Sequence, residues 1–209
     1  MIKNGAAVIL IGICSLLSEV AHAQSDSSAL NAIKSNLMAG KVFKAQLDNK
    51  FIDPTTKDTV HTSGEIWIGK NEYKIHMNER YIVVDGKISR VYSEQKNQVI
   101  ISNYDPSEDD YAPSHFLAGT QKEYMVRQKK GPNGDTHVVL FSRDPFSLFK
   151  QVDIMVDKQN DIPIWIKSVD QTGNITISRF YKGEYVMATS KMFDLKYPSD
   201  AHIVDLRKE

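Results

Sequence analysis

The chain is almost free of cysteine. Its single cysteine, Cys14, lies in the first 23 residues, which have the order of a secretory signal. This segment has Lys3 near its start, an apolar run from Ala6 to Leu17, and the cleavage pattern Ala21-His22-Ala23. We therefore expect an exported chain that begins at Gln24 after cleavage. Without a thiol, that mature chain can form no disulfide, no cysteine metal site and no cysteine nucleophile.

Long hydrophobic runs and net charge are missing too. The apolar run of the signal has about a dozen residues, fewer than the roughly 20 that a membrane-spanning helix needs. Ile13 precedes Cys14, where a lipid-attachment signal needs a small residue, so we expect no lipid anchor. The 26 basic and 26 acidic residues balance, and no overall field favours nucleic acid as a partner. The 186 residues after the signal (209 minus 23) suit one domain.

One amphipathic helix is predicted near the start of the mature chain, over residues 27–38. Ser27 or Ser28 can cap it, and Gly40 ends it. Its apolar residues fall on one face; they are Leu30, Ile33 and Leu37.

The rest of the chain predicts a mainly β protein. Eleven runs have the length and β-branched content of strands, at about 42–51, 61–69, 72–77, 80–85, 87–92, 97–103, 123–129, 136–141, 148–156, 163–169 and 174–181. Turn residues such as Asp85-Gly86 and Asn160-Asp161 separate them, so we expect an antiparallel meander. A sheet of about eleven strands should curl into a barrel or a partly open one. The stretch 104–119 interrupts this rhythm and predicts a loop with a short helix.

Catalytic and metal-binding motifs are weak or missing. Residues 64–70 have the glycine and lysine spacing of a phosphate-binding loop, but Asn71 stands where magnesium needs Ser or Thr. The five histidines of the mature chain are too far apart in sequence to share a zinc ion on one element. No Gly-x-Ser-x-Gly motif is present. Adjacent carboxylates occur at Glu108, Asp109 and Asp110, which we interpret as a solvated turn or a partner contact rather than an acid-base pair. We expect no cofactor, no metal and no enzymatic activity.

A collinear series of short motifs resembles the family of outer-membrane lipoprotein carriers called LolA. The series covers nearly the whole mature chain; it comprises Ser63-Gly64-Glu65-Ile66-Trp67-Ile68, Tyr73-Lys74-Ile75, Val84-Asp85-Gly86-Lys87, Val91-Tyr92-Ser93, Asn97-Gln98-Val99, Pro113-Ser114-His115-Phe116-Leu117, Asp170-Gln171-Thr172-Gly173, the segment 193–198 and Val204-Asp205-Leu206. The family usually has an Arg-Pro pair after the Trp-containing strand, where this chain has Gly69 and Lys70. The family arginine ties the lid to the barrel, so Lys70 is the residue that could replace it.

The resemblance implies an unclosed antiparallel half-barrel with the N-terminal helix and the short mid-chain helix as its lid. It also implies a periplasmic, monomeric chaperone that takes acylated lipoproteins from an inner-membrane transporter and passes them to an outer-membrane acceptor. The alternatives are a related lipid-binding or sensor module of the cell envelope and, less favoured, an enzyme.

Alternation along the strands and along the predicted helices nominates the residues of an acyl-chain cavity and its lid. The expected cavity lining is Phe43, Leu47, Tyr73, Ile75, Ile82, Val84, Val99, Ile101, Ile164 and Ile166. The expected lid residues are Leu30, Ile33, Leu37, Phe116 and Leu117.

Overall fold

The computed structural model describes residues 27–106, 109, 112–118 and 123–208. The expected signal, residues 1–23, and Glu108 and Asp110 of the acidic loop lie outside these residues. Within them, no helix combines the length and the hydrophobicity that a membrane crossing requires.

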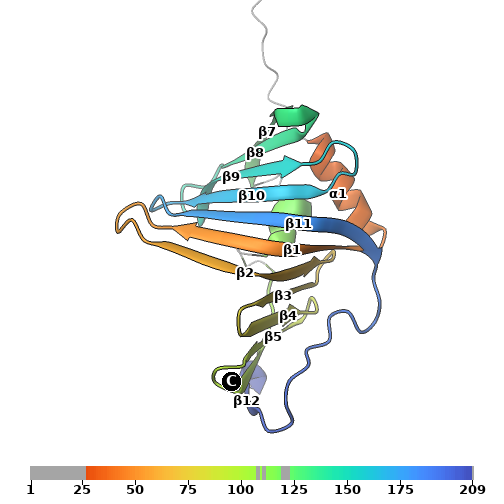
Figure 1. Ribbon diagram of the computed structural model, residues 1–209, viewed down its shortest axis with the longest axis vertical. Coiled ribbons are helices and arrows are strands. Elements are labelled where there is room, and N and C mark those ends of the chain that lie inside the picture. Colours follow the sequence, from red (N-terminus) through yellow and green to blue (C-terminus); the bar gives the residue numbers. More distant parts are fainter. Residues whose placement is uncertain (1–26, 107–108, 110–111, 119–122, 209) are drawn as a thin grey trace, which may run out of the picture.

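A single twelve-stranded sheet forms the body of the protein, and Figure 1 shows its twist. Its strands are β1 (Lys41–Ile52), β2 (Thr59–Ile68), β3 (Tyr73–Met77), β4 (Arg80–Val84), β5 (Ile88–Ser93), β6 (Gln98–Asn103), β7 (Tyr124–Lys130), β8 (Thr136–Ser142), β9 (Phe149–Val156), β10 (Pro163–Asp170), β11 (Ile175–Met187) and β12 (His202–Asp205). The order across the sheet is β12-β6-β5-β4-β3-β2-β1-β11-β10-β9-β8-β7. The two edge strands, β12 and β7, do not pair with each other, so the sheet is unclosed. The predicted mainly β, unclosed fold is confirmed.

The eleven predicted strands all form, and they pair with one another in an antiparallel manner. The prediction of one continuous meander is wrong, because β1 pairs with β11 and β6 does not pair with β7. The sequence analysis missed β12, which pairs with β6 in parallel. Residues 188–201 carry the chain from β11 to β12 and form the long blue connection in Figure 1; residues 195–198 of this connection lie beside Lys74, Tyr81 and Tyr92 of β3–β5.

Two helices cover the inner face of the sheet. They are α1 (Ser28–Met38) and α2 (Pro113–Ala118); two short 3-10 helices, Pro132–Gly134 and Leu206–Lys208, lie elsewhere. The Ser27 hydroxyl caps α1 by accepting a hydrogen bond from the Leu30 amide at 3.3 Å. The same hydroxyl donates to Oε1 of Gln128 on β7 at 2.6 Å, so the start of α1 is fixed to an edge strand. Gly40 follows with a φ of +77°, which lets the chain turn directly into β1.

The main core lies between α1, α2 and the inner face of the sheet. The predicted apolar stripe of α1, with Leu30, Ile33 and Leu37, is buried there. Phe43 of β1 is fully buried and packs edge-to-face on Phe180 of β11, with ring centroids 5.5 Å apart.

Candidate functional site: an apolar trough under two helices

A partly covered chamber of about 270 Å³ lies between α2 and the inner face of the sheet. Seven strands contribute to its walls, β1–β4 and β9–β11, and α2 roofs it. Its lining residues are Leu47, Asn49, Ile66, Ile75, Met77, Ile82, Pro113, Phe116, Phe149, Ile166, Ser168, Thr176, Ser178 and Phe180. None of these side chains carries a charge.

The chamber continues into a more open hollow of about 350 Å³ over the inner face of β2–β5. The two share Ile75, Met77 and Ile82, and we call them together the trough. The open part also reaches the β3–β4 and β5–β6 turns, where Glu79, Arg80 and Gln95 line it. The trough is therefore partly covered and mainly apolar under α2, and more open and more polar at its end.

The chamber also has a polar side formed by uncharged groups. The Ser178 hydroxyl donates to Oδ1 of Asn49 at 2.8 Å, which joins β11 to β1. Ser168 and Thr176, which face each other across β10 and β11, line the same side. A ligand with an apolar chain and a small neutral polar group fits this lining better than an ion does.

The lid is fixed to the sheet by aromatic contacts of α2. The Phe116 ring packs edge-to-face on Phe149 at 5.5 Å and on Tyr124 at 6.5 Å, while Leu117 is fully buried beside it. On the same helix, Nε2 of His115 lies 3.2 Å from Oε2 of Glu123. The Phe116 ring thus both lines the chamber and holds α2, its roof, against the sheet.

A hydrogen bond ties the segment before α2 to the sheet. The hydroxyl of Tyr73 on β3 donates to Oδ2 of Asp109 at 2.7 Å. Burial raises the pKa of Tyr73 well above its ordinary value, and the hydrogen bond to Asp109 raises it further, so the hydroxyl stays a donor. Tyr104 packs edge-to-face on Tyr73 at 6.3 Å. We call the contact between Tyr73 and Asp109 the latch.

The family resemblance suggested Lys70 for the contact between lid and barrel, but the structure shows such a contact at Tyr73 and Asp109 instead. Lys70 is exposed, and it makes no hydrogen bond or ion pair with any residue that the structure describes. Asp109, which the sequence analysis assigned to a solvated turn, is instead the acceptor that fixes the segment before α2.

The structure brings five of the predicted residues together around the chamber. They are Leu47, Ile75, Ile82 and Ile166 of the expected lining and Phe116 of the expected lid. The other expected lid residues, Leu30, Ile33, Leu37 and Leu117, are buried in the core between the helices and the sheet.

The other predicted lining residues lie elsewhere. Phe43 is packed inside the core, and Tyr73 and Val84 form a small cluster with Ala112 beneath the segment before α2. Ile164 falls at a register irregularity of β10, between Pro163 and Trp165.

Val99 and Ile101 lie on the outer face of β6. The register shows this, because Val99 pairs with Tyr92 and Ile101 with Arg90, whereas Ile100 pairs with Val91 and through it with Ile82 of the trough. Neither Val99 nor Ile101 can reach the trough.

Several lining residues were missed by the sequence analysis. Ile66 pairs directly with Ile75, so strand alternation alone could have found it. Phe149 and Phe180 carried no such signal, because each sits in a strand whose apolar residues point to both faces. The missed lining residues are Asn49, Ile66, Met77, Pro113, Phe149, Ser168, Thr176, Ser178 and Phe180.

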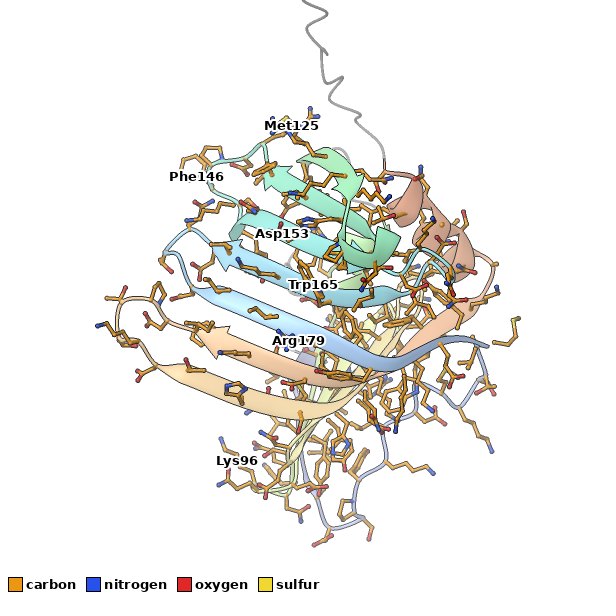
Figure 2. The ribbon with its side chains drawn as sticks, turned by 45° about the horizontal axis from the view of Figure 1, so that its top comes forward. Lys96, Met125, Phe146, Asp153, Trp165 and Arg179 are labelled. Atoms are coloured by element: carbon orange, nitrogen blue, oxygen red, sulfur yellow. The ribbon has the colours of Figure 1, made fainter. Side chains whose placement is uncertain are left out.

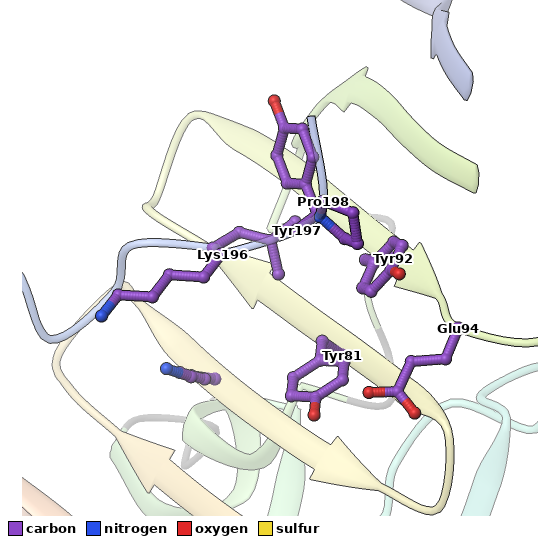
Figure 3. A pocket seen from close by; sticks show the side chains of 8 residues that line it. Tyr81, Tyr92, Glu94, Lys196, Tyr197 and Pro198 are labelled. Atoms are coloured by element: carbon purple, nitrogen blue, oxygen red, sulfur yellow. The ribbon is translucent and has the colours of Figure 1, made fainter. Parts of the chain in front are cut away.

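A second hollow, of about 610 Å³, lies on the outer face between residues 195–198 and β3–β5 (Figure 3). Lys74 and Glu94 line it, and Tyr81 and Tyr92 stand in its wall. The Tyr81 ring stacks on His76 at 4.0 Å and lies 6.0 Å from Tyr92, so these rings mainly face one another. Although this hollow is larger than the chamber, its charged and phenolic lining does not suit an acyl chain.

Groups that could support other chemistry are few. Among the described residues, no three His, Cys, Asp or Glu side chains gather to hold a metal ion. On the outer face, Nε2 of His137 lies 2.8 Å from Oδ1 of Asp153, and Gln151 donates to the other carboxylate oxygen at 2.6 Å. This pair is on the opposite face of the sheet from the trough.

Solved structures with a similar fold come from several bacteria. An uncharacterized conserved protein from Thermus thermophilus has 14% sequence identity and a TM-score of 0.56, over 85% of this chain and 96% of its own. A LolA superfamily protein from Nitrosomonas europaea has 12% identity and a TM-score of 0.46, over 80% and 96%. A putative outer membrane lipoprotein-sorting protein domain from Vibrio parahaemolyticus has 10% identity and a TM-score of 0.43, over 79% and 95%. No family model and no curated protein matches the chain. The likeness to the Thermus structure shows a shared fold.

Proposed function

We propose that this protein is a periplasmic chaperone that shelters the acyl chains of lipoproteins in the trough. It would receive them from an inner-membrane transporter and pass them to an outer-membrane acceptor, without a cofactor. The observation that carries the proposal is the uncharged chamber beneath α2, which is continuous with an open hollow on the same face. The motifs that resemble the LolA family support the same reading.

Partial burial of the cargo is part of the proposal. A tri-acylated anchor has on the order of 45 methylenes, and at about 0.8 kcal/mol each their complete transfer from water would stabilise the complex by roughly 35 kcal/mol. That exceeds the practical ceiling of about 20 kcal/mol for non-covalent binding, and release would then be impossible without an energy source. The chamber of about 270 Å³ has the volume of only about nine water-sized groups, so α2 must move for longer chains to enter.

The test is the chemistry of what the protein carries. The mature chain, purified from a native periplasm, should bring acylated lipoprotein with it, detected by mass spectrometry. Ile75→Asp places a charge in the trough and should abolish this cargo and the release of lipoproteins from spheroplasts. Ile203→Asp is the matched control, because Ile203 is 50% exposed on β12 and should tolerate the charge. Cargo that is absent from the wild type, or retained by Ile75→Asp, would contradict the proposal.

A second candidate function is the binding or sensing of one free lipid. The small volume of the chamber favours it, since one chain requires less movement of α2 than the three chains of a tri-acylated anchor. The same mass spectrometry separates the two functions, because a free fatty acid or phospholipid would appear in place of acylated protein.

A further inference from the structure

One end of the sheet carries three loops that lie next to one another. We call it the rim, and its loops are the β1–β2 loop (residues 53–58), the β8–β9 loop (143–148) and the β10–β11 turn (171–174). Nε2 of Gln171 donates to the Ser147 carbonyl at 2.8 Å, which joins two of them. Pro54 lies against Gly173, which joins the third. Figure 1 shows the β1–β2 hairpin extending furthest at this end.

Phe146, in the β8–β9 loop, is 92% exposed, the most exposed large hydrophobic side chain of the described residues. Figure 2 shows it at the outer margin of the protein. The loop that holds it is braced: the Phe146 amide donates to Oδ1 of Asp144 at 2.8 Å, and the Arg143 amide donates to the Glu123 carbonyl at 3.0 Å. The exposed Phe146 ring is therefore carried by a loop whose backbone is held by hydrogen bonds.

Further apolar groups stand at the same end, on the face that holds the trough. Phe51 and Val60 pair across the end of the β1–β2 hairpin and are 36% and 53% exposed. Phe51 also pairs with Thr176, which lines the chamber. The β8–β9 loop leads directly into Phe149, another lining residue. Apolar rings and uncharged polar side chains therefore line the way from the rim to the chamber.

We propose that the rim docks on a lipid bilayer and inserts the Phe146 side chain among the lipids, so that an acyl chain passes between membrane and trough without crossing water. This inference rests on the proposed function. One ring on a loop and one cross-strand pair at a hairpin end offer no flat patch of the size that a stable protein interface buries. A fluid bilayer can close around each of them, and aromatic side chains are enriched at its interface.

The rim loops carry charges of both signs, with three carboxylates (Asp53, Asp58 and Asp144) and two cations (Lys57 and Arg143). The carboxylates of Asp53, Asp144 and Asp170 accept hydrogen bonds from amides of their own loops. Lys57 and Arg143 are exposed and use their side chains in no hydrogen bond or ion pair within the described part of the chain. These two cations remain available to anionic lipid head groups.

The experiment measures co-sedimentation of the mature chain with vesicles of phosphatidylethanolamine and phosphatidylglycerol. Phe146→Ser should weaken binding about tenfold, which corresponds to about 1.4 kcal/mol. Phe146→Trp should bind as the wild type does, and brominated lipid should quench its added fluorescence. Met187→Ser is the control, since Met187 is 65% exposed at the far end of β11 and should not contribute.

Binding of a water-soluble fluorescent fatty acid, measured without vesicles, separates this inference from the proposed function. Phe146→Ser should keep that binding, because its side chain does not line the trough. If the wild type does not bind the vesicles, or if Phe146→Ser binds them equally well, the rim does not dock on lipid. A protein partner for the rim is then the alternative. If fatty-acid binding is absent throughout, the proposed function fails as well.

Discussion

The latch between Tyr73 and Asp109 predicts how firmly the lid is held. Tyr73→Phe removes only the hydroxyl that donates to Asp109 at 2.7 Å and keeps the ring, which is 8% exposed and packs on Tyr104. Hydrogen bonds to charged groups contribute about 1.5–3 kcal/mol. Because Asp109 is partly exposed and water can replace the phenol, we expect about 1.5 kcal/mol, or roughly a tenfold larger equilibrium constant for opening the segment.

Hydrogen–deuterium exchange of residues 112–118 measures that opening directly. Their amides should exchange about tenfold faster in Tyr73→Phe, and uptake of a fluorescent fatty acid should accelerate. Tyr185→Phe is the matched control, since its half-buried hydroxyl donates to the Asp161 carbonyl at 3.1 Å, far from the latch. Equal exchange of α2 in the wild type and in Tyr73→Phe, or equal acceleration in both variants, would refute the role of the latch.

Three further substitutions test the frame around the trough. Gly64→Ala should lower the midpoint of thermal unfolding by several degrees in a calorimetric scan. The added Cβ of the alanine would stand 1.8 Å from the His76 carbonyl oxygen and push β3 away from β2. An unchanged midpoint would contradict this packing. Phe43→Ala should destabilise the protein by about 3–5 kcal/mol in urea unfolding, since the side chain is fully buried; a loss below about 1 kcal/mol would show that the core collapses around the gap. Burial opposes ionisation of Asp170, but hydrogen bonds from Thr172 and Asn174 outweigh it and hold the pKa below its ordinary value of 3.8. The carboxylate therefore stabilises the fold above pH 3.8 and loses this effect as the pH falls through its lower folded pKa. Asp170→Asn should consequently be less stable than the wild type at pH 7 and nearly equal to it in acid. A stability difference that does not depend on pH would exclude this account.

The strands were predictable because their limits are set by local turn chemistry. Asp85-Gly86 is an example: Gly86 has a φ of +86°, and the Asp85 carboxylate accepts hydrogen bonds from the amides of Lys87 and Ile88. The strand β12 has no comparable local signal. Its four residues become a strand only by pairing with β6, and that partner lies about a hundred residues away in the chain.

The site was predicted only in part, because apolar residues occupy both faces of β4–β6. Residues 195–198 cross the outer face beside Tyr92, so Val83, Tyr92 and Val99 are buried on the side opposite to the trough. Alternation then shows that a strand has two apolar faces, but it does not show which face holds a ligand. The latch was unpredictable for another reason, since nothing local to Asp109 indicates that Tyr73 lies beside it.

The pairing of β12 with β6 also has a consequence for the order in which the fold is assembled. Gln98 meets His202 in this ladder, 104 residues further on (202 minus 98), so the free edge of β6 has no partner until nearly all of the described chain has been synthesised. An unpaired, β-branched edge is a template for association with other chains. We expect the incomplete chain to need protection at Val99–Ile101 until its last strand arrives.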